Sequence, residues 1–455
     1  MHTHKIILLV FACMILFSCK KSWIEDRSNK SLDVPNTIVD FQALLDNVLI
    51  MNDNHPNIGE AGADNYYVPY ALWQTWPSTY RNAYVWEKDI YNNALTDLPN
   101  WNNAYRQVFY ANIVLDGIDK VGSEQLNDPA WNNAKGSAYF YRAEAFFNIS
   151  QLYAQPFSLT FPDYPGIPLR LNADPNAVSV RASLSDSYKQ IESDLLNSVD
   201  YLPVVPLYKT RPSKPAAYAL LSRYYLVKQD FSRALNYADL CLKLYDSLLD
   251  YNTLNASATY PVPGFNREVI YEATLQDDPL YNVVFVDSNL YMSYDNNDVR
   301  KKLLFKTNAL GQATFSGTYT GGTASSISKA FGGIASDEIY LTRAECYART
   351  GNLAAAMNDL NSLLKLRWKT GTFVAKTAAN TSEALALILQ ERRKETLFRG
   401  LRWLDLRRLN LDGANITLTR NLNNQIYTLP PNDPRYVLPI PPDVIAISGM
   451  TQNER

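Results

Sequence analysis

Two helix–turn–helix segments with the same order of large and small residues constrain the fold of this chain most. The first reads PAAYALLSRYYLVKQDFSRALNYADLCLKLY and the second reads EIYLTRAECYARTGNLAAAMNDLNSLLKLRW. In each segment, Ala, Ser or Gly allows two antiparallel helices to approach closely, and Tyr, Phe and Leu fill the spaces between them. One such pair cannot bury its apolar face alone, so pairs stack against one another. The two segments therefore predict a mainly α scaffold of stacked helix pairs.

The packing positions of both segments match those of a tetratricopeptide repeat. They are Tyr218, Leu221, Ser222, Tyr225, Phe231, Ala234, Ala238 and Cys241 in the first segment, and Tyr340, Ala344, Tyr347, Gly351, Leu353, Ala356 and Leu360 in the second. Helical periodicity predicts further helices over 37–52, 101–119, 132–157 and 183–203, with Pro156 and Pro203 ending the last two.

Two long stretches, 53–100 and 250–335, are rich in Tyr, Asn, Asp, Gly, Ser and Thr. This composition predicts long irregular loops with a few short strands, carried on the helical scaffold. Binding sites usually lie on loops of this kind, because a rigid scaffold can hold them in place.

The N-terminus has the pattern of a lipoprotein signal. Lys5 precedes IILLVFACMILF, an apolar run of about twelve residues that is too short to span a bilayer. The run ends in LFSC, which resembles a bacterial lipobox with Cys19 as the lipidated first residue of the mature chain. The alternatives are ordinary cleavage near Ser18 beside a bystander cysteine, or an uncleaved anchor. We divide the chain into a signal peptide at 1–18, an N-terminal region at 19–200 and a C-terminal region at 201–455, the last two packed as one globular unit.

A basic stretch, ERRKETLFRGLRWLDLRRLN, runs over 391–410. The formal net charge of the whole chain is −2, so no global attraction to nucleic acid or anionic membrane is indicated. Glu395 and Arg399 have the spacing of a favourable i,i+4 pair, and Arg402, Asp405 and Arg408 follow at i,i+3. We therefore predict a helix with one apolar stripe and a solvated or internally paired basic face.

Histidine and cysteine usage limits the possible chemistry. Only His55 of three histidines survives removal of the signal, so a His-rich zinc site is excluded, and we expect His55 in a surface loop. Cys241 and Cys346 lie in helical surroundings as small buried apolar residues, and no disulfide framework is needed. An Asp/Asn run near residue 296 lacks the Gly and Glu of a calcium loop, and we predict neither a metal site nor a cofactor.

The lipobox and seven further segments, all in one order, resemble the SusD/RagB family of surface lipoproteins from Bacteroidota. They are the lipobox, GSAYFYRAEAFFNISQLYAQPF, SLSDSYKQIESDLLNSVDYLP, TRPSKPAAYALLSRYYLVKQDFSRALNYAD, YDNNDVR, EIYLTRAECYARTGN, and the basic stretch followed by YVLPIPPDVIAISGMTQNE. The resemblance implies a SusD-like superhelix in which the arginines of 391–410 pack into the scaffold and bind carbonyls and carboxylates of neighbouring loops. It also implies a non-catalytic protein on the outer face of the outer membrane. Such a protein captures a glycan, or in some members a peptide, and delivers it to a SusC-like TonB-dependent transporter.

Sugar capture requires flat aromatic rings together with amide, carboxylate and guanidinium groups for the hydroxyls. The stretch DNYYVPYALWQTWPSTYRNAYVWEKD offers both, and YMSYDNNDVR is a second candidate, in which Asp298 and Arg300 are read as structural. The candidate ligand-binding residues are Trp73, Trp76, Asp64, Asn65, Tyr66, Tyr80, Arg81, Trp86, Tyr291 and Tyr294. The alternative for each ring is a structural one, in which it packs its loop onto the helical core.

Two further function classes stay open from the residues alone. A secreted helical glycoside hydrolase would need two carboxylates at a fixed separation, which the sequence cannot exclude. A helical-repeat scaffold could instead bind only protein. Incubation of the purified protein with oligosaccharides separates the three classes by hydrolysis, retention without turnover, or absence of interaction.

The lipobox generates a first prediction. Cys19→Ala removes the acceptor of the lipid, so the protein should move from the membrane fraction to the soluble fraction when cells are lysed and fractionated. Unchanged membrane retention, with no lipid on the wild-type N-terminus by mass spectrometry, would contradict the assignment. Protease treatment of intact cells then shows which side of the membrane the protein faces.

Overall fold

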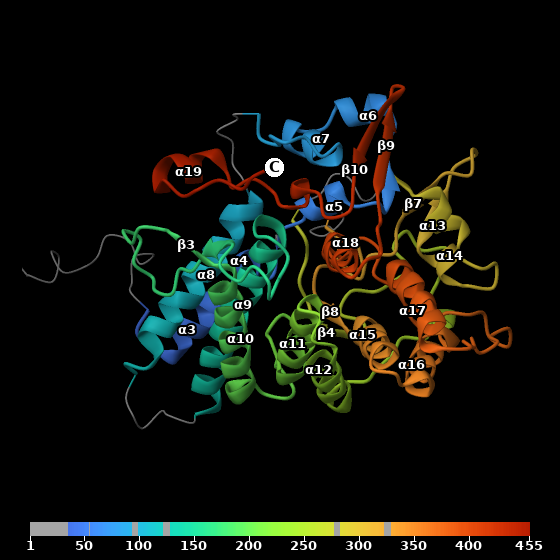
Figure 1. Cartoon of the computed structure of the whole chain (residues 1–455). Helices are drawn as coiled ribbons and strands as arrows, with labels where there is room; N and C mark the ends of the chain where they lie inside the picture. Colours follow the sequence, from blue (N-terminus) through green and yellow to red (C-terminus); the bar gives the residue numbers. More distant parts are fainter. Residues whose placement is uncertain (1–34, 54, 93–98, 122–127, 277–282, 323–328) are drawn as a thin grey trace, which may run out of the picture.

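A computed structural model describes residues 35–53, 55–92, 99–121, 128–276, 283–322 and 329–455 (Figure 1). Within these ranges the chain forms seventeen α-helices, α3 to α19, and short strands that pair two by two. The prediction of a mainly α scaffold with long loops and a few short strands is confirmed. In the described ranges, no helix combines the length and apolar character needed to cross a membrane.

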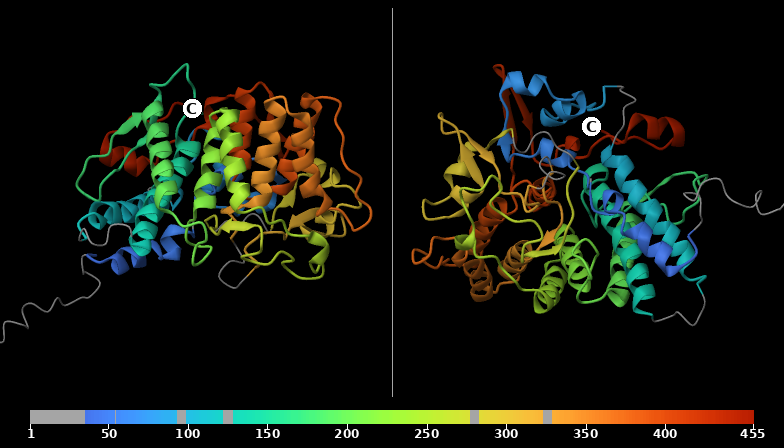
Figure 2. Two further views of the ribbon diagram at one scale, coloured as in Figure 1. Left: turned by 90° about the horizontal axis from the view of Figure 1, so that it is seen from below. Right: turned by 180° about the vertical axis from the view of Figure 1, so that it is seen from behind.

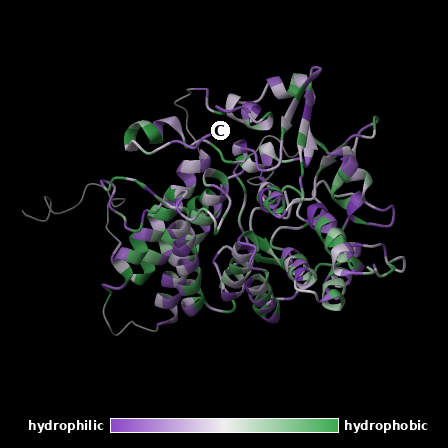
Figure 3. Ribbon diagram, viewed as in Figure 1, coloured by the Kyte–Doolittle hydropathy of each residue, from purple (hydrophilic) through white to green (hydrophobic). Residues whose placement is uncertain are grey.

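Eight helices form a continuous array along one side of the molecule (Figures 1 and 2). In chain order they are α8 (Pro99–Ile118), α9 (Pro129–Tyr153), α10 (Leu184–Tyr201), α11 (Lys214–Val227), α12 (Phe231–Leu244), α15 (Ser336–Arg349), α16 (Leu353–Lys365) and α17 (Thr381–Glu395). Each helix packs against the next one in this order. Figure 3 shows apolar and polar residues alternating along these helices, as expected when one face of each is buried.

The two repeat segments fold as the pairs α11–α12 and α15–α16, as predicted. Their small residues lie at the helix contacts: Ala234, Ala238 and Cys241 are fully buried, and the Ser222 hydroxyl donates across the pair to the Ala234 carbonyl at 2.9 Å. Cys346 is also buried, and neither of these two cysteines forms a disulfide.

The other predicted helices begin and end where the sequence indicates. The Ser183 hydroxyl accepts from the Asp186 amide at the start of α10, which ends two residues before Pro203. Helix α9 ends at Tyr153, before Pro156. The predicted helix over 37–52 is the exception, because it is broken into α3 (Ile38–Leu45) and α4 (Val48–Met51). Asp46 ends α3 and forms an ion pair with Arg211 instead of continuing the helix.

The two loop regions contain short elements of their own. The first holds α5 (Ile58–Gly62), β1 (Tyr66–Tyr67), α6 (Tyr70–Gln74) and α7 (Ser78–Tyr84). The second holds β4 (Val269–Tyr271), β5 (Phe285–Val286), α13 (Ser288–Met292), α14 (Arg300–Leu303), β6 (Phe305–Thr307), β7 (Ala313–Phe315) and β8 (Ile334–Ala335). Strand β4 pairs with β8, β6 with β7, and β1 with β5.

The remaining elements enclose these loops. Strands β2 (Pro165–Pro168) and β3 (Arg181–Ser183) form a hairpin beside α10, and β9 (Leu418–Leu422) and β10 (Gln425–Leu429) form another beside α6 (Figure 1). Helix α18 (Arg402–Leu411) packs on α5 and α11, and α19 (Pro442–Ser448) lies near the C-terminus.

The basic stretch is two helices rather than the one that was predicted. Helix α17 ends at Glu395 and α18 begins at Arg402, and between them Phe398 and Gly400 adopt φ angles of 57° and 74°. The predicted pairing of Glu395 with Arg399 is therefore wrong: Glu395 binds Arg300 and Arg367.

The basic face of this stretch is buried and paired, not solvated. Arg392 is 1% exposed and binds Asp405 at 2.9 Å, and Arg399 binds Asp337 at 2.8 Å. The predicted pair of Asp405 with Arg408 is present at 2.8 Å, whereas Arg402 turns to another carboxylate, described below. Arg407 donates to backbone carbonyls at the end of α9. These contacts confirm that the arginines bind carbonyls and carboxylates of neighbouring segments.

His55 is buried and not in a surface loop, so this prediction is wrong. It is 4% exposed, and its Nε2 lies 3.6 Å from the Glu144 carboxylate of α9. Its backbone bridges to Leu275, so the histidine joins the first loop region to the second.

Candidate functional site

The two loop regions that the sequence marks for binding meet at one small sheet. Strand β1 pairs antiparallel with β5, with Tyr66 opposite Val286 and Tyr67 opposite Phe285. The first strand leads into α6 and α7, and the second leads into α13. The candidates around residues 64–86 and the candidates at Tyr291 and Tyr294 are therefore carried by elements that share this sheet.

Arginines of α17 and α18 hold the base of the first loop region. Asp64 accepts two hydrogen bonds from Arg402, at 2.6 and 2.9 Å, and lies 3.3 Å from Arg393. Burial alone would raise the pKa of Asp64, but the guanidinium groups outweigh this effect and hold the pKa at about 2. Asp64 is thus ionised at neutral pH, and its pairing with two arginines makes it a structural anchor and not a free ligand-binding group.

A third arginine holds the backbone of the same region. Arg420 of β9 is 6% exposed, and its guanidinium group donates to the Tyr66 carbonyl at 2.8 Å and to the Ala63 carbonyl. It also lies 4.0 Å from the centre of the Tyr84 ring. The loop is therefore fixed by charge-assisted bonds from the C-terminal part of the chain.

Five of the candidate residues lie in the packed core. They are Asn65, Tyr66, Trp76, Trp86 and Tyr294, each 1–6% exposed. Several use their polar atoms within the protein: Trp86 Nε1 donates to the Gly62 carbonyl at 2.9 Å, and the Tyr294 hydroxyl donates to the Lys394 carbonyl at 2.8 Å. For these residues the structure favours the alternative reading, in which the rings pack the loops onto the scaffold.

Further polar groups of the two loop regions are also bound within the protein. The Tyr80 hydroxyl, half-buried, donates to Asn57 Oδ1 at 2.9 Å. Burial raises the pKa of Glu60, on α5, to about 7, with Asn65 Nδ2 3.4 Å from its carboxylate. Asp298 and Arg300, read as structural, form a fully buried ion pair at 2.7 Å.

An aromatic platform remains at the surface, formed by Tyr70, Trp73 and Arg81. The Tyr70 and Trp73 rings stack with centroids 5.6 Å apart and an interplanar angle of 26°. The Arg81 guanidinium carbon lies 5.8 Å from the centre of the Trp73 ring, and Trp73 Nε1 donates to the Arg81 carbonyl at 3.2 Å. Tyr70 is 37% exposed, and Trp73 is half-buried. The platform thus combines two stacked, nearly parallel rings with a cation at the surface.

Tyr70 was not among the predicted site residues. The signal was present in the sequence, because Pro69 can begin a helix and Tyr70 and Trp73 are then three residues apart on one face. Tyr291, from the second candidate group, is half-buried on α13. Its ring packs edge-to-face on the Phe305 ring, with centroids 5.4 Å apart, and Lys301 Nζ lies 5.5 Å from its centroid. Among the described residues, no group of three or more His, Cys, Asp or Glu side chains could hold a metal ion.

Family models match two segments that together cover more than half of the chain. Residues 22–226 match a family described as starch-binding and associating with the outer membrane, and residues 336–455 match the SusD family. The SusD-like protein P2 of Formosa agariphila is 23% identical over 418 residues, which cover 78% of this chain and 79% of that protein.

Solved structures share the fold over nearly the whole chain. A SusD superfamily protein from Bacteroides thetaiotaomicron superposes with a TM-score of 0.74 and 22% identity, covering 92% of this chain and all of the other. A laminarin-binding SusD-like protein superposes with a TM-score of 0.65 and 17% identity, covering 91% of this chain and 97% of the other.

Proposed function

The chain belongs to the SusD/RagB family, and from this premise we propose that it captures an oligo- or polysaccharide at the cell surface and delivers it to a SusC-like TonB-dependent transporter. One of the two matching families is described as starch-binding, and one of the similar solved structures is a laminarin-binding protein. The observation that carries the proposal is the platform of Tyr70, Trp73 and Arg81 on a loop fixed by buried arginines.

The chemistry of the platform suits a sugar. Flat ring faces pack against the C–H face of a pyranose, and a neighbouring guanidinium group can donate to its hydroxyls. Strand β1 of the first loop region pairs with β5, which leads into α13, the helix that carries Tyr291. We therefore retain Trp73, Arg81 and Tyr291 as ligand-binding residues and add Tyr70.

The same geometry supports binding without catalysis. Glycoside hydrolysis needs one carboxyl group that can be protonated as a general acid. Asp64, the candidate carboxylate of this region, is held ionised by Arg402 and Arg393, with a pKa of about 2. It cannot supply that acid at neutral pH. Glu60, whose pKa burial raises to about 7, is only 4% exposed and is therefore out of reach of a ligand at the surface.

Trp73→Ala should weaken glycan binding roughly tenfold, since loss of an aromatic anchor costs about 1–3 kcal/mol. The melting temperature should stay nearly unchanged, because Trp73 is half-buried at the surface. Laminarin and starch, immobilised in affinity gels and then titrated as oligosaccharides, are suitable first probes. Tyr208→Ala is a matched control, because this tyrosine is 61% exposed outside the platform.

Trp76→Ala separates the two readings of this loop. Trp76 is 6% exposed and packs edge-to-face on Tyr84 at 5.7 Å, so its loss should destabilise the protein by about 3–5 kcal/mol.

Unchanged glycan binding by the Trp73→Ala and Tyr70→Ala variants would exclude the platform as the binding site. Release of shorter sugars from the oligosaccharide would support the hydrolase alternative.

We further propose that the protein is anchored by a lipid on Cys19, which lies outside the described residues, and acts in complex with the transporter at the outer membrane. Extraction in mild detergent and affinity purification should recover a large β-barrel partner, identifiable by mass spectrometry. Repeated recovery of the lipoprotein alone under these conditions would instead indicate a free-standing glycan binder.

A further inference from the structure

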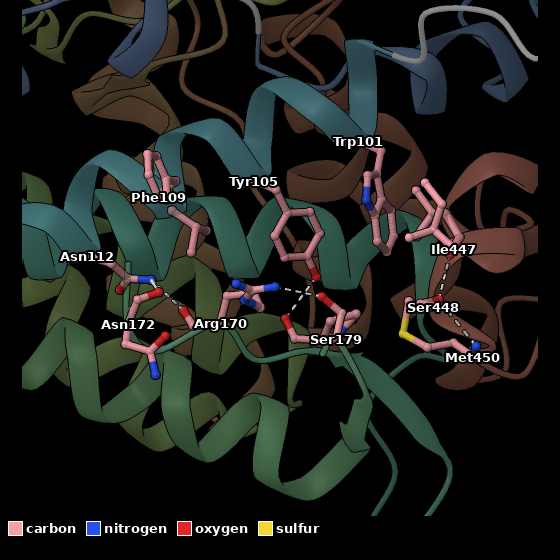
Figure 4. A pocket seen from close by; sticks show the side chains of 13 residues that line it. Trp101, Tyr105, Phe109, Asn112, Arg170, Asn172, Ser179, Ile447, Ser448 and Met450 are labelled. Atoms are coloured by element: carbon pink, nitrogen blue, oxygen red, sulfur yellow. Dashed lines mark hydrogen bonds between the residues drawn. The ribbon is translucent and has the colours of Figure 1, made fainter. Parts of the chain in front are cut away.

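A cleft opens between α8, the loop 168–179 and α19, with a cavity of about 310 Å³ (Figure 4). We call it the α8–α19 cleft. Its walls include Trp101, Tyr105 and Phe109 from α8, Arg170 from the loop, and Ile447 and Met450 from the C-terminal segment. None of these residues belongs to the platform of Tyr70, Trp73 and Arg81.

One wall of the cleft is a row of aromatic rings. Trp101, Tyr105 and Phe109 are spaced four residues apart on α8 and line the cleft, and the Trp101 and Tyr105 rings point into it (Figure 4). The Trp101 and Tyr105 rings lie 4.8 Å apart at 40°, and Phe109 is 38% exposed at the outer end of the row. The exposure of the rings therefore increases along the row, from the buried Trp101 to the exposed Phe109.

The end of the cleft beside Trp101 is also apolar and faces solvent (Figure 4). Ile447 on α19 is 88% exposed, and Val444 and Met450 line the cleft beside it. An isoleucine with this exposure gains apolar contact only when something occupies the space beside it. Burial of such a side chain contributes roughly 1.5–3 kcal/mol.

The polar groups of the cleft are largely used to build its walls. The Tyr105 hydroxyl donates to the Pro168 carbonyl at 2.9 Å, and Arg170 donates to the Ala177 carbonyl and to Ser179 Oγ. Asn112 Nδ2 donates to the carbonyls of Arg170 and Asn172, at 2.8 and 3.0 Å. These bonds fix the loop against α8, and they leave the cleft with ring faces and few hydrogen bonds to offer.

We propose that the α8–α19 cleft is a second binding site, which takes a flat, weakly polar aromatic ring and not a free sugar. A free pyranose would lose the hydration of its hydroxyls without finding partners for them, which is unfavourable. An aromatic ring loses little hydration and stacks on the row of Trp101, Tyr105 and Phe109, where pairs of rings at centroid distances of about 4.5–7 Å attract each other. A small free aromatic molecule has this chemistry.

Indole is a suitable probe, titrated into the full mature protein and followed by NMR. Phe109→Ala and Ile447→Lys remove one ring and one apolar wall, and each should weaken indole binding roughly fivefold or more. Two matched variants carry the same changes at exposed positions outside the cleft: Phe265→Ala at 57% exposure and Ile426→Lys at 67%. Both should bind indole like the wild type.

Glucose tests the selectivity of the cleft, and it should not displace indole. Equal indole affinity in all four variants, no measurable binding by the wild type, or displacement by glucose would each overturn the proposal. Glycan capture at the platform does not enter these outcomes, because Trp73 and Tyr70 are intact in every variant.

Discussion

The structure depends on buried arginines that join helices distant in the sequence. Arg300 is fully buried and binds Asp298, Glu391 and Glu395, at distances of 2.6–2.7 Å. Arg367 continues the network from Glu395 to Glu268. Burial raises the pKa of Glu395, but the two arginines outweigh that effect and bring it to about 2, so the carboxylate stays charged.

Such a network determines geometry more than it adds stability. Taking each charge out of water costs several kcal/mol, which well-placed partners largely repay, whereas removal of one partner leaves a buried charge and costs about 3–5 kcal/mol. The planar guanidinium group adds direction, because it matches a carboxylate with two bonds at once. Arg402 and Asp64 form such a pair, which sets the position of the loop that carries α6 and α7. This pair and the bonds from Arg420 hold the loop that carries the aromatic platform.

The scaffold could be predicted from sequence because its signals are local. Ser222, Ala234 and Ala238 mark a close helix contact, and the residues that fill it lie within the same segment. The breaks could not be predicted in this way. The chain leaves the helix after Glu395 and turns through Phe398 and Gly400 at positive φ, and the Glu395 carboxylate binds Arg300, 95 residues away, a partner that has no local signal. The prediction that His55 lies in a surface loop was wrong for the same reason, because its contacts Glu144 and Leu275 are both distant in the sequence.

The sequence directs attention to one region for the candidate site, and the structure shows which side chains of that region reach the surface. Composition shows that rings gather over 64–86, yet it does not show which of them face inward. Trp73 and Trp76 differ by three positions, but α6 ends at Gln74, so Trp76 falls beyond the helix and enters the core. The α8–α19 cleft was missed because its row of rings has the same spacing as a core-facing helix.

The central claim is that the C-terminal arginines fix the loop on which we propose that the glycan binds. Hydrogen–deuterium exchange of Arg402→Lys tests it directly, since lysine keeps the charge but cannot make both bonds to Asp64. The amides of α6 and α7 should exchange faster than in the wild type, and glycan affinity should fall. Arg211→Lys breaks a comparable two-bond pair with Asp46, and should leave α6 and α7 unchanged. Exchange in α6 and α7 that is identical in Arg402→Lys and the wild type would contradict the account.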